Sequence, residues 1–262
     1  MKPLCAVIPA GGKGTRLYPL TYAVPKELLP LGPVPTIQHV VDELVAAGID
    51  DIIVVTGPGK RAVEDHLDEI RRRDQTTARF TYVSQKHQMG LGDAVNAAAA
   101  AVGDRAFAVA LGDGIIAGPE RASLLGRMLA LHEREGAAAV IAAQEVARDD
   151  VGRYGIFTPG EPCADGFAVT DLVEKPAADD APSTLAVCAR YVFAPVIFDY
   201  LEAQAPGSGG EIQLTDAIAA MARDAGGVYA CPLRADERRL DVGSIESYYD
   251  AVASVLRCGT GN

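Results

Sequence analysis

The first apolar run of the sequence leads into a glycine-rich segment, GGKGTRLYPLTYAVPKELLP, at residues 11–30. Three glycines occupy four positions there, and the segment also carries Lys13, Arg16 and Lys26. Glycine lets backbone N–H groups approach an anion closely, and three cations around one glycine turn favour a polyphosphate ligand. The spacing is not that of a Walker A loop, and Leu17 stands where a dinucleotide fingerprint has its third glycine. The segment therefore predicts a phosphate site of another kind.

Two aspartates follow strand-like runs later in the chain and are candidate metal ligands. Asp113 ends the apolar run AFAVALGD, and Asp241 lies in LDVGS. In phosphate sites Mg²⁺ commonly uses one or two carboxylates together with phosphate oxygens. A lone aspartate at a strand end is more often a helix or turn cap, and the spacing alone does not bring these two together.

The segment VEKP places a carboxylate and an ammonium next to each other at a strand end. Glu174 and Lys175 precede Pro176, which stops the strand because it lacks a backbone N–H. A carboxylate suits sugar hydroxyls and an ammonium suits a phosphate, so the pair is a candidate sugar-phosphate site. The alternative is an exposed ion pair that contributes about 0–1 kcal/mol to stability.

These residues need a scaffold, and the first half of the sequence indicates an alternation of strands and helices. Apolar runs predict buried parallel strands, and i, i+3, i+4, i+7 patterns predict helices between them. The strands are expected at 4–10, 51–57, 79–85 and 106–113, and the helices at 36–48, 60–73, 91–103 and 120–135. Such an alternation favours a doubly wound α/β sheet, in which ligands bind beyond the carboxyl ends of the strands.

The second half is less regular. It predicts a strand at 137–146, a hairpin or ribbon at 155–176, a strand at 184–195, a helix at 211–227, a strand at 227–233 and a helix at 244–257. We find no repeat or linker, so we expect one domain over residues 1–262, an α/β fold with a mixed, mainly parallel sheet and a small β-ribbon annex.

Composition limits the class of protein. The 262 residues are 49% hydrophobic and carry a formal net charge of -11, which argues against nucleic-acid or anionic-membrane partners. The five cysteines form no C-x-x-C pair, no uncharged apolar stretch approaches 18 residues, and the amino-terminal run is too short for a signal peptide. We therefore expect a soluble, cytoplasmic protein.

Several segments, in this order, resemble bacterial UTP–glucose-1-phosphate uridylyltransferases, which are sugar-1-phosphate nucleotidyltransferases. The resemblance runs from about residue 4 to residue 253. The segments are PAGGKGTRLYPLTYAVPKELLP, VTGPGKRAVEDHLD, QKHQMGLGDA, YGIF, VEKP, RYVFAPVIFDYLE and GGEIQLTDAI. It implies a Rossmann-like nucleotidyltransferase fold whose nucleotide-binding part spans about 1–115 and whose sugar-phosphate-binding part spans about 116–262.

The resemblance also implies a reaction. The phosphate oxygen of a sugar 1-phosphate, with glucose 1-phosphate favoured, attacks the α-phosphorus of an NTP, with UTP favoured, and pyrophosphate leaves. Arg16 would hold the pyrophosphate portion and Lys26 the reacting phosphates, with Mg²⁺ as cofactor. The implied nucleotide-binding residues are Ala10, Gly11, Gly12, Lys13, Gly14, Thr15, Gln85 and Gly90. The implied sugar-phosphate residues are Gly155, Glu174, Lys175 and Glu211, and the implied metal ligands are Asp113 and Asp241.

The sequence departs from the family pattern at a few positions. Gln88, Met89 and Asp93 flank the expected base pocket, and Ala189 replaces a glycine on the sugar side. Transfer with dTTP, ATP or GTP, or with another sugar or cyclitol 1-phosphate, is therefore an alternative. A non-catalytic sugar-nucleotide-binding protein is a second alternative, disfavoured because all the charged motif residues are kept. The resemblance further implies a homo-oligomer, either a dimer or a tetramer.

Overall fold

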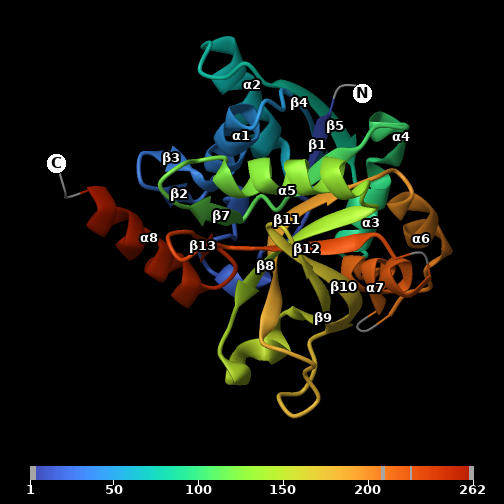
Figure 1. Ribbon diagram of the computed structural model, residues 1–262. Helices are drawn as coiled ribbons and strands as arrows, with labels where there is room; N and C mark the ends of the chain where they lie inside the picture. The colour runs from blue at the N-terminus through green and yellow to red at the C-terminus, as the bar shows by residue number, and fades with distance from the viewer. Residues whose placement is uncertain (1–3, 208–209, 225, 260–262) are drawn as a thin grey trace.

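A nine-stranded mixed sheet forms the centre of the molecule (Figure 1). The structure is a computed structural model that describes residues 4–207, 210–224 and 226–259. The strand order is β5-β4-β1-β6-β11-β8-β12-β10-β9. These strands are β1 (Cys5–Pro9), β4 (Asp51–Thr56), β5 (Arg79–Ser84), β6 (Phe107–Ala110), β8 (Ala139–Glu145), β9 (Gly155–Cys163), β10 (Gly166–Glu174), β11 (Leu185–Phe193) and β12 (Val228–Pro232).

The direction of the strands changes in the middle of the sheet. β5, β4, β1 and β6 are parallel neighbours, as are β8 and β12. β11 runs antiparallel to both β6 and β8 and so joins the two parallel groups. β5, β4, β1 and β6 therefore present their carboxyl ends at the same edge of the sheet, as the sequence predicts. β11 lies next to β6 and runs in the opposite direction.

Helices cover both faces of the sheet because its strands alternate apolar side chains between the faces. In β1, Cys5 and Val7 point into one core and Ala6 and Ile8 into the other. The first core includes residues of α3 (Leu91–Ala97), α4 (Ala99–Val102), α6 (Ile197–Ala203) and α7 (Leu214–Asp224). The second includes residues of α1 (Thr36–Ala46), α2 (Arg61–Arg72) and α5 (Ser123–Glu135).

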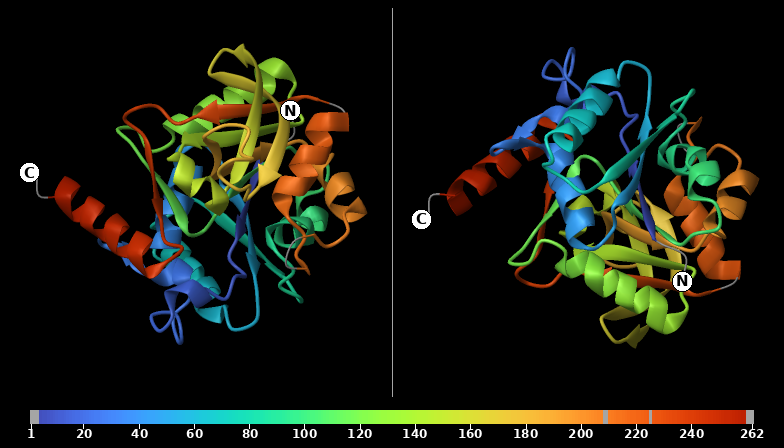
Figure 2. Two further views of the ribbon diagram at one scale, coloured as in Figure 1. Left: turned by 90° about the horizontal axis from the view of Figure 1, so that it is seen from below. Right: turned by 90° about the horizontal axis from the view of Figure 1, so that it is seen from above.

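Two short antiparallel sheets lie beside the main one. β2 (Pro30–Leu31) pairs with β3 (Val34–Pro35), and β7 (Gly114–Ala117) pairs with β13 (Arg238–Asp241). The last helix, α8 (Ile245–Gly259), contacts β13 and β2, and its far end projects from the body in all three views (Figures 1 and 2). The β7–β13 pairing matters for the site because it places a late segment beside the end of β6.

The α/β class with a mixed, mainly parallel sheet is confirmed, with three local differences. The expected hairpin at 155–176 forms β9 and β10, but these extend the main sheet, and the separate ribbons are the two short sheets. The expected helix at 91–103 is interrupted at Ala98. β5 is an edge strand with one neighbour, so its side chains are partly exposed and not buried as predicted. No helix within the described part of the chain is long and apolar enough to cross a membrane.

Candidate active site

One open cleft of about 820 Å³ lies where the carboxyl ends of β1, β6 and β10 meet the loops before α3 and α7. It is lined by every residue that the sequence assigned to the site except Ala10 and Asp241. The Ala10 side chain is fully buried in the core, and its backbone N–H donates to the Val55 carbonyl at 2.8 Å. Asp241 lies at the end of β13, next to the cleft residue Arg239. The sequence therefore identified one cleft from motifs that are far apart along the chain.

The glycine-rich loop is shaped by contacts at three of its glycines. Gly14 has φ 68°, in the left-handed region that favours glycine, and its carbonyl accepts from Thr21 Oγ1 at 2.7 Å. A Cβ on Gly11 would lie 2.6 Å from Gln85 Oε1, so a side chain at this position would displace the Gln85 amide. A Cβ on Gly12 would lie 3.6 Å from Lys26 Nζ. The loop thus rests on the side chain of Lys26, and its backbone borders the cleft.

Lys26 links the loop to the first metal candidate. Its Nζ lies 2.5 Å from Asp113 Oδ2, and the two side chains are only 19% and 18% exposed. Burial would lower the pKa of Lys26, but the charges of Asp113 and Glu27 outweigh it and raise that pKa. Burial would raise the pKa of Asp113, but Lys26 outweighs it and lowers that pKa. Both groups are therefore charged at neutral pH.

A second ion pair lies beneath the first and was not predicted. Lys60 Nζ donates to Glu27 Oε2 at 2.7 Å, and both side chains are buried. A Cβ on Gly112 would lie 3.3 Å from Glu27 Cγ, so this pair supports the segment that carries Asp113. Lys60 escaped prediction because GPGKR has no phosphate-loop spacing and because its partner is distant in sequence.

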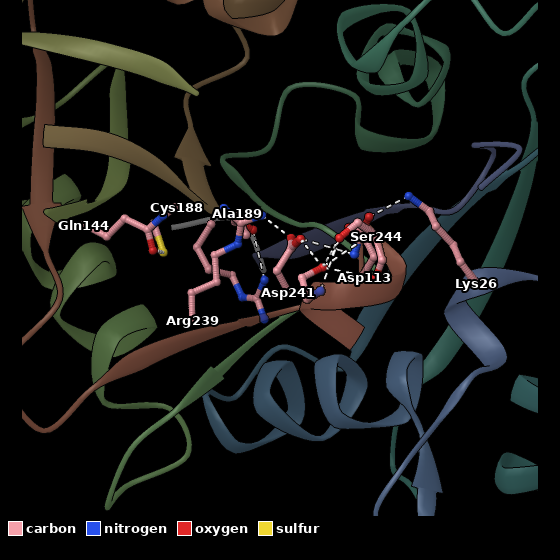
Figure 3. A network of polar contacts seen from close by, with 11 residues as sticks. Lys26, Asp113, Gln144, Cys188, Ala189, Arg239, Asp241 and Ser244 are labelled. Atoms are coloured by element: carbon pink, nitrogen blue, oxygen red, sulfur yellow. Dashed lines mark hydrogen bonds and ion pairs between the residues drawn. The ribbon is translucent and has the colours of Figure 1, made fainter. Parts of the chain in front are cut away.

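The segments that carry the two aspartates predicted as metal ligands lie side by side. Asp241 faces Gly114 across the β7–β13 pair, and the Val242 N–H donates to the Asp113 carbonyl at 2.8 Å. Asp113 and Asp241 lie between Lys26 and Arg239 (Figure 3). Arg239 was not predicted. Its Nη2 donates to Asp241 Oδ1, and although burial would lower the pKa of Arg239, Asp241 and Asp113 raise it.

This donor set fits Mg²⁺ in a phosphate site. Carboxylate oxygens are the hard ligands that Mg²⁺ prefers, and it usually keeps several positions for water and phosphate oxygens. Within residues 4–207, 210–224 and 226–259 no group of three or more His, Cys, Asp or Glu side chains could hold a metal ion. Asp113 and Asp241 would thus supply part of the coordination, and ligand phosphates would have to supply much of the rest.

The opposite side of the cleft carries the Glu174–Lys175 pair. Lys175 Nζ lies 2.9 Å from Glu174 Oε1, and Thr215 Oγ1 donates to Glu174 Oε2 at 2.8 Å. Lys175 has φ 46°, and its N–H donates to the Tyr154 carbonyl at 2.9 Å. The Lys175 side chain is 56% exposed, so its ammonium is free to turn toward a ligand in the cleft. A Cβ on Gly155 would lie 2.9 Å from Thr215 Cγ2, which explains the glycine there.

Ala189 lies in the same cleft at a bulge in β11. Its φ is 51°, so an L-residue occupies a backbone conformation that glycine adopts more easily. The next residue, Arg190, is fully buried and pairs with Glu43 of α1 through two hydrogen bonds of 3.0 and 2.7 Å. This pair fixes β11 against α1 and holds the bulge beside the cleft.

The comparisons with known proteins agree with this geometry. A family model described as nucleotidyl transferase matches residues 5–257. The chain belongs to the nucleotidyltransferase family. UTP–glucose-1-phosphate uridylyltransferase 2 of Staphylococcus saprophyticus is 44% identical over 256 residues, which cover 91% of this chain and 86% of the relative. The enzyme of that activity from Staphylococcus epidermidis is 44% identical over 234 residues, which cover 82% of this chain and 80% of the relative.

Solved structures extend the similarity to the fold of this nucleotidyltransferase. A UDP-glucose pyrophosphorylase complexed with UDP-glucose superposes with a TM-score of 0.90 at 34% identity, over 98% of this chain and 99% of that chain. A UTP-bound UGPase from Acinetobacter baumannii superposes with a TM-score of 0.83 at 32% identity, over 99% and 94% of the two chains. The family resemblance inferred from the motifs is therefore confirmed.

Proposed function

We propose that this nucleotidyltransferase is a UTP–glucose-1-phosphate uridylyltransferase, which converts UTP and glucose 1-phosphate into UDP-glucose and pyrophosphate. The observation that carries the proposal is the single cleft, in which the glycine loop and Lys26 face the Glu174–Lys175 pair. The names of the relatives at 44% identity support the same substrates. The cleft therefore has a triphosphate side and a sugar-phosphate side.

The reaction needs positioning and charge neutralisation more than covalent help from the protein. A phosphate oxygen of glucose 1-phosphate attacks the α-phosphorus of UTP, and the bond to the bridging oxygen of pyrophosphate breaks. The glycine-loop N–H groups would hold the triphosphate, and Lys26 would lie against the reacting phosphates. Arg16 would hold the leaving pyrophosphate. A Cβ on Gly243 would lie 3.4 Å from Arg16 Nη2, so the guanidinium lies beside the β13 end of the cleft.

Asp113 and Asp241 would hold Mg²⁺. The bound ion would neutralise phosphate charge and orient the triphosphate for in-line attack. Lys26 and Arg239 already neutralise these carboxylates, so the two aspartates stay close together without mutual repulsion. This arrangement would keep the two carboxylates, which are the protein's part of the ligand set, in place before the substrates bind.

On the sugar side, Lys175 would bind the phosphate of glucose 1-phosphate. Glu174 would accept hydrogen bonds from sugar hydroxyls, with its orientation fixed by Thr215. Gly155 and Glu211 border the same part of the cleft and would contact the sugar. We further propose that the enzyme is cytoplasmic and that it forms a homo-oligomer. Light scattering on the purified protein would test the oligomeric state.

Pyrophosphate release tests the proposed function directly. The purified protein is incubated with Mg²⁺, each of UTP, dTTP, CTP, ATP and GTP, and glucose 1-phosphate or another sugar 1-phosphate. Release should be fastest with UTP and glucose 1-phosphate and should need both substrates. Release with a different pair would reassign the substrates, and no release from any pair would favour a non-catalytic nucleotide-sugar-binding protein.

A further inference from the structure

The base side of the cleft contains a glutamine whose amide orientation is fixed by its surroundings. Gln85 follows β5 and is only 5% exposed. Its Nε2 donates to Asp93 Oδ2 at 2.6 Å and to the Gly90 carbonyl at 3.3 Å. A carboxylate and a carbonyl can only accept hydrogen bonds, so both partners require the nitrogen of the amide on their side. The amide oxygen must therefore point the other way.

The other way is into the cleft. Gln85 Oε1 lies against Gly11, where a Cβ would approach it to 2.6 Å, and both residues line the cleft. We find no donor for this oxygen among the described residues. Gln85 thus offers a ligand one acceptor. Rotating the amide by half a turn would place Oε1 against the Asp93 carboxylate and the Gly90 carbonyl, which are themselves acceptors.

We propose that Asp93 is a positioning residue that sets the base preference of this enzyme, by holding Gln85 in the orientation that accepts a hydrogen from N3 of uracil. The inference rests on the proposed function, which places a uracil nucleotide beside Gln85 and Gly90. Uracil and thymine carry a hydrogen on N3, whereas N3 of cytosine is an acceptor. A fixed acceptor opposite N3 favours the first two bases and opposes the third.

Asp93 is well placed for this role. It lies in the first turn of α3, where a negative charge is favourable, and its carboxylate receives a short, charge-assisted bond from Gln85. The Gly90 carbonyl is a longer contact and also accepts from the Ala94 N–H at 3.2 Å. Of the two acceptors, Asp93 therefore contributes more to the amide orientation.

The test compares kcat/KM for UTP, dTTP and CTP in the wild type, Asp93→Ala and Asp93→Asn. Asp93→Ala removes the charged acceptor, and the UTP-over-CTP preference should fall about tenfold or more. Asp93→Asn keeps the shape and can either accept or donate, so its preference should fall less. The UTP-over-dTTP preference should stay unchanged in both variants, because both bases carry the N3 hydrogen.

A purely structural role of Asp93 predicts a different pattern. It would lower kcat/KM for all three nucleotides by the same factor, and that result, or an unchanged UTP-over-CTP ratio, would overturn the inference. Asp199→Ala is a matched control, because Asp199 is an exposed first-turn aspartate of α6 outside the cleft. If a thermal melt shows that Asp93→Ala is unfolded at the assay temperature, the isosteric Asp93→Asn variant provides the test of the UTP-over-CTP preference.

Failure of the proposed function has a separate signature. Calorimetric binding of UTP, dTTP and CTP needs no sugar phosphate and no turnover. A wild type that binds UTP over CTP and loses this preference in Asp93→Ala would support the inference even if glucose 1-phosphate were the wrong acceptor. A wild type that turns over UTP and glucose 1-phosphate, with variants of unchanged preference, would refute the inference alone.

Discussion

Replacing Lys26 with methionine tests the electrostatics of the whole triphosphate side. Methionine keeps most of the length of the side chain that lies beneath Gly12 and Gly14 but removes the charge. Asp113 then loses the ammonium 2.5 Å from its Oδ2 and stays largely buried. We expect this variant to lose both catalytic rate and stability, and to lose stability in a way that depends on pH.

The size of the stability loss follows from the exposure of the pair. Exposed ion pairs contribute about 0–1 kcal/mol, and removing one partner of a fully buried pair costs about 3–5 kcal/mol. Lys26 and Asp113 are 19% and 18% exposed and lie between these limits. We therefore expect Lys26→Met to lower the free energy of unfolding by about 2 kcal/mol, which corresponds to about 4–8 °C in Tm for a chain of this size.

The pH dependence has a definite sign. In the wild type Lys26 holds the pKa of Asp113 below its ordinary value of 3.8, so Asp113 contributes stability above about pH 4, and this is lost as the pH falls through its folded-state pKa. In Lys26→Met the ammonium no longer opposes burial, which is the largest effect on this carboxyl, so we expect the pKa of Asp113 to rise above its wild-type value although Arg239 still lowers it. The charged carboxylate then destabilises the variant at neutral pH, and its protonation relieves that cost. The difference in the free energy of unfolding between the wild type and Lys26→Met should narrow as the pH falls toward 4.

Urea denaturation of both proteins between pH 8 and pH 4.5 measures this gap. Lys86→Met is the control, because Lys86 is exposed outside the cleft and its loss removes the same charge without breaking a buried pair. At neutral pH, kcat for UTP should fall about 100–1000-fold in Lys26→Met. A gap that stays constant or widens at low pH would refute the coupling between Lys26 and Asp113, and an unchanged kcat would remove Lys26 from the reacting phosphates.

Three further variants test other parts of the cleft. Lys175→Ala should raise the KM for glucose 1-phosphate about tenfold while leaving the KM for UTP within about twofold, since the ammonium faces the sugar side; equal changes in steady-state kinetics would contradict this. Asp241→Asn should raise the Mg²⁺ concentration for half-maximal turnover about tenfold or more, and an unchanged Mg²⁺ titration would exclude it as a ligand. Ala189→Gly should raise the free energy of unfolding by about 0.5–1 kcal/mol, because relief of the conformation at φ 51° outweighs the added entropy of the unfolded chain; urea denaturation that shows a decrease would contradict it.

Periodic and local features were the ones that the sequence predicted well. The apolar stripe of α1 buries Ile37, Val40, Val41 and Leu44, and the glycine loop begins where β1 ends. A helix or a glycine turn is decided by neighbours within a few positions, so its pattern is visible in one short segment. The mixed sheet was likewise accessible, because alternating strands and helices leave few other arrangements.

Contacts between distant, irregular segments were not accessible. Asp113 and Asp241 meet because β7 pairs with β13, and both strands are too short to give a clear pattern of alternation. Arg239 and Lys60 are single cations whose partners lie on other elements, and nothing in their own segments distinguishes them from solvated charges. The roles assigned to the site residues stay predictions until the variants are measured.

The charges of the cleft suit the binding of a triphosphate that we propose for this acidic protein. Three of its cations are each paired with a carboxylate: Lys26 with Asp113, Arg239 with Asp241 and Lys175 with Glu174. An incoming phosphate therefore competes with a carboxylate for the same cation. The carboxylates that lose this competition are those proposed to hold Mg²⁺ and the sugar hydroxyls. A phosphate that binds one of these cations leaves its carboxylate without a positive partner, and a bound metal ion would supply one. Binding of the anions and binding of the metal should therefore favour each other. The net charge of -11 is a sum over the whole chain, whereas the exchange of partners inside the cleft acts at distances too short to be screened.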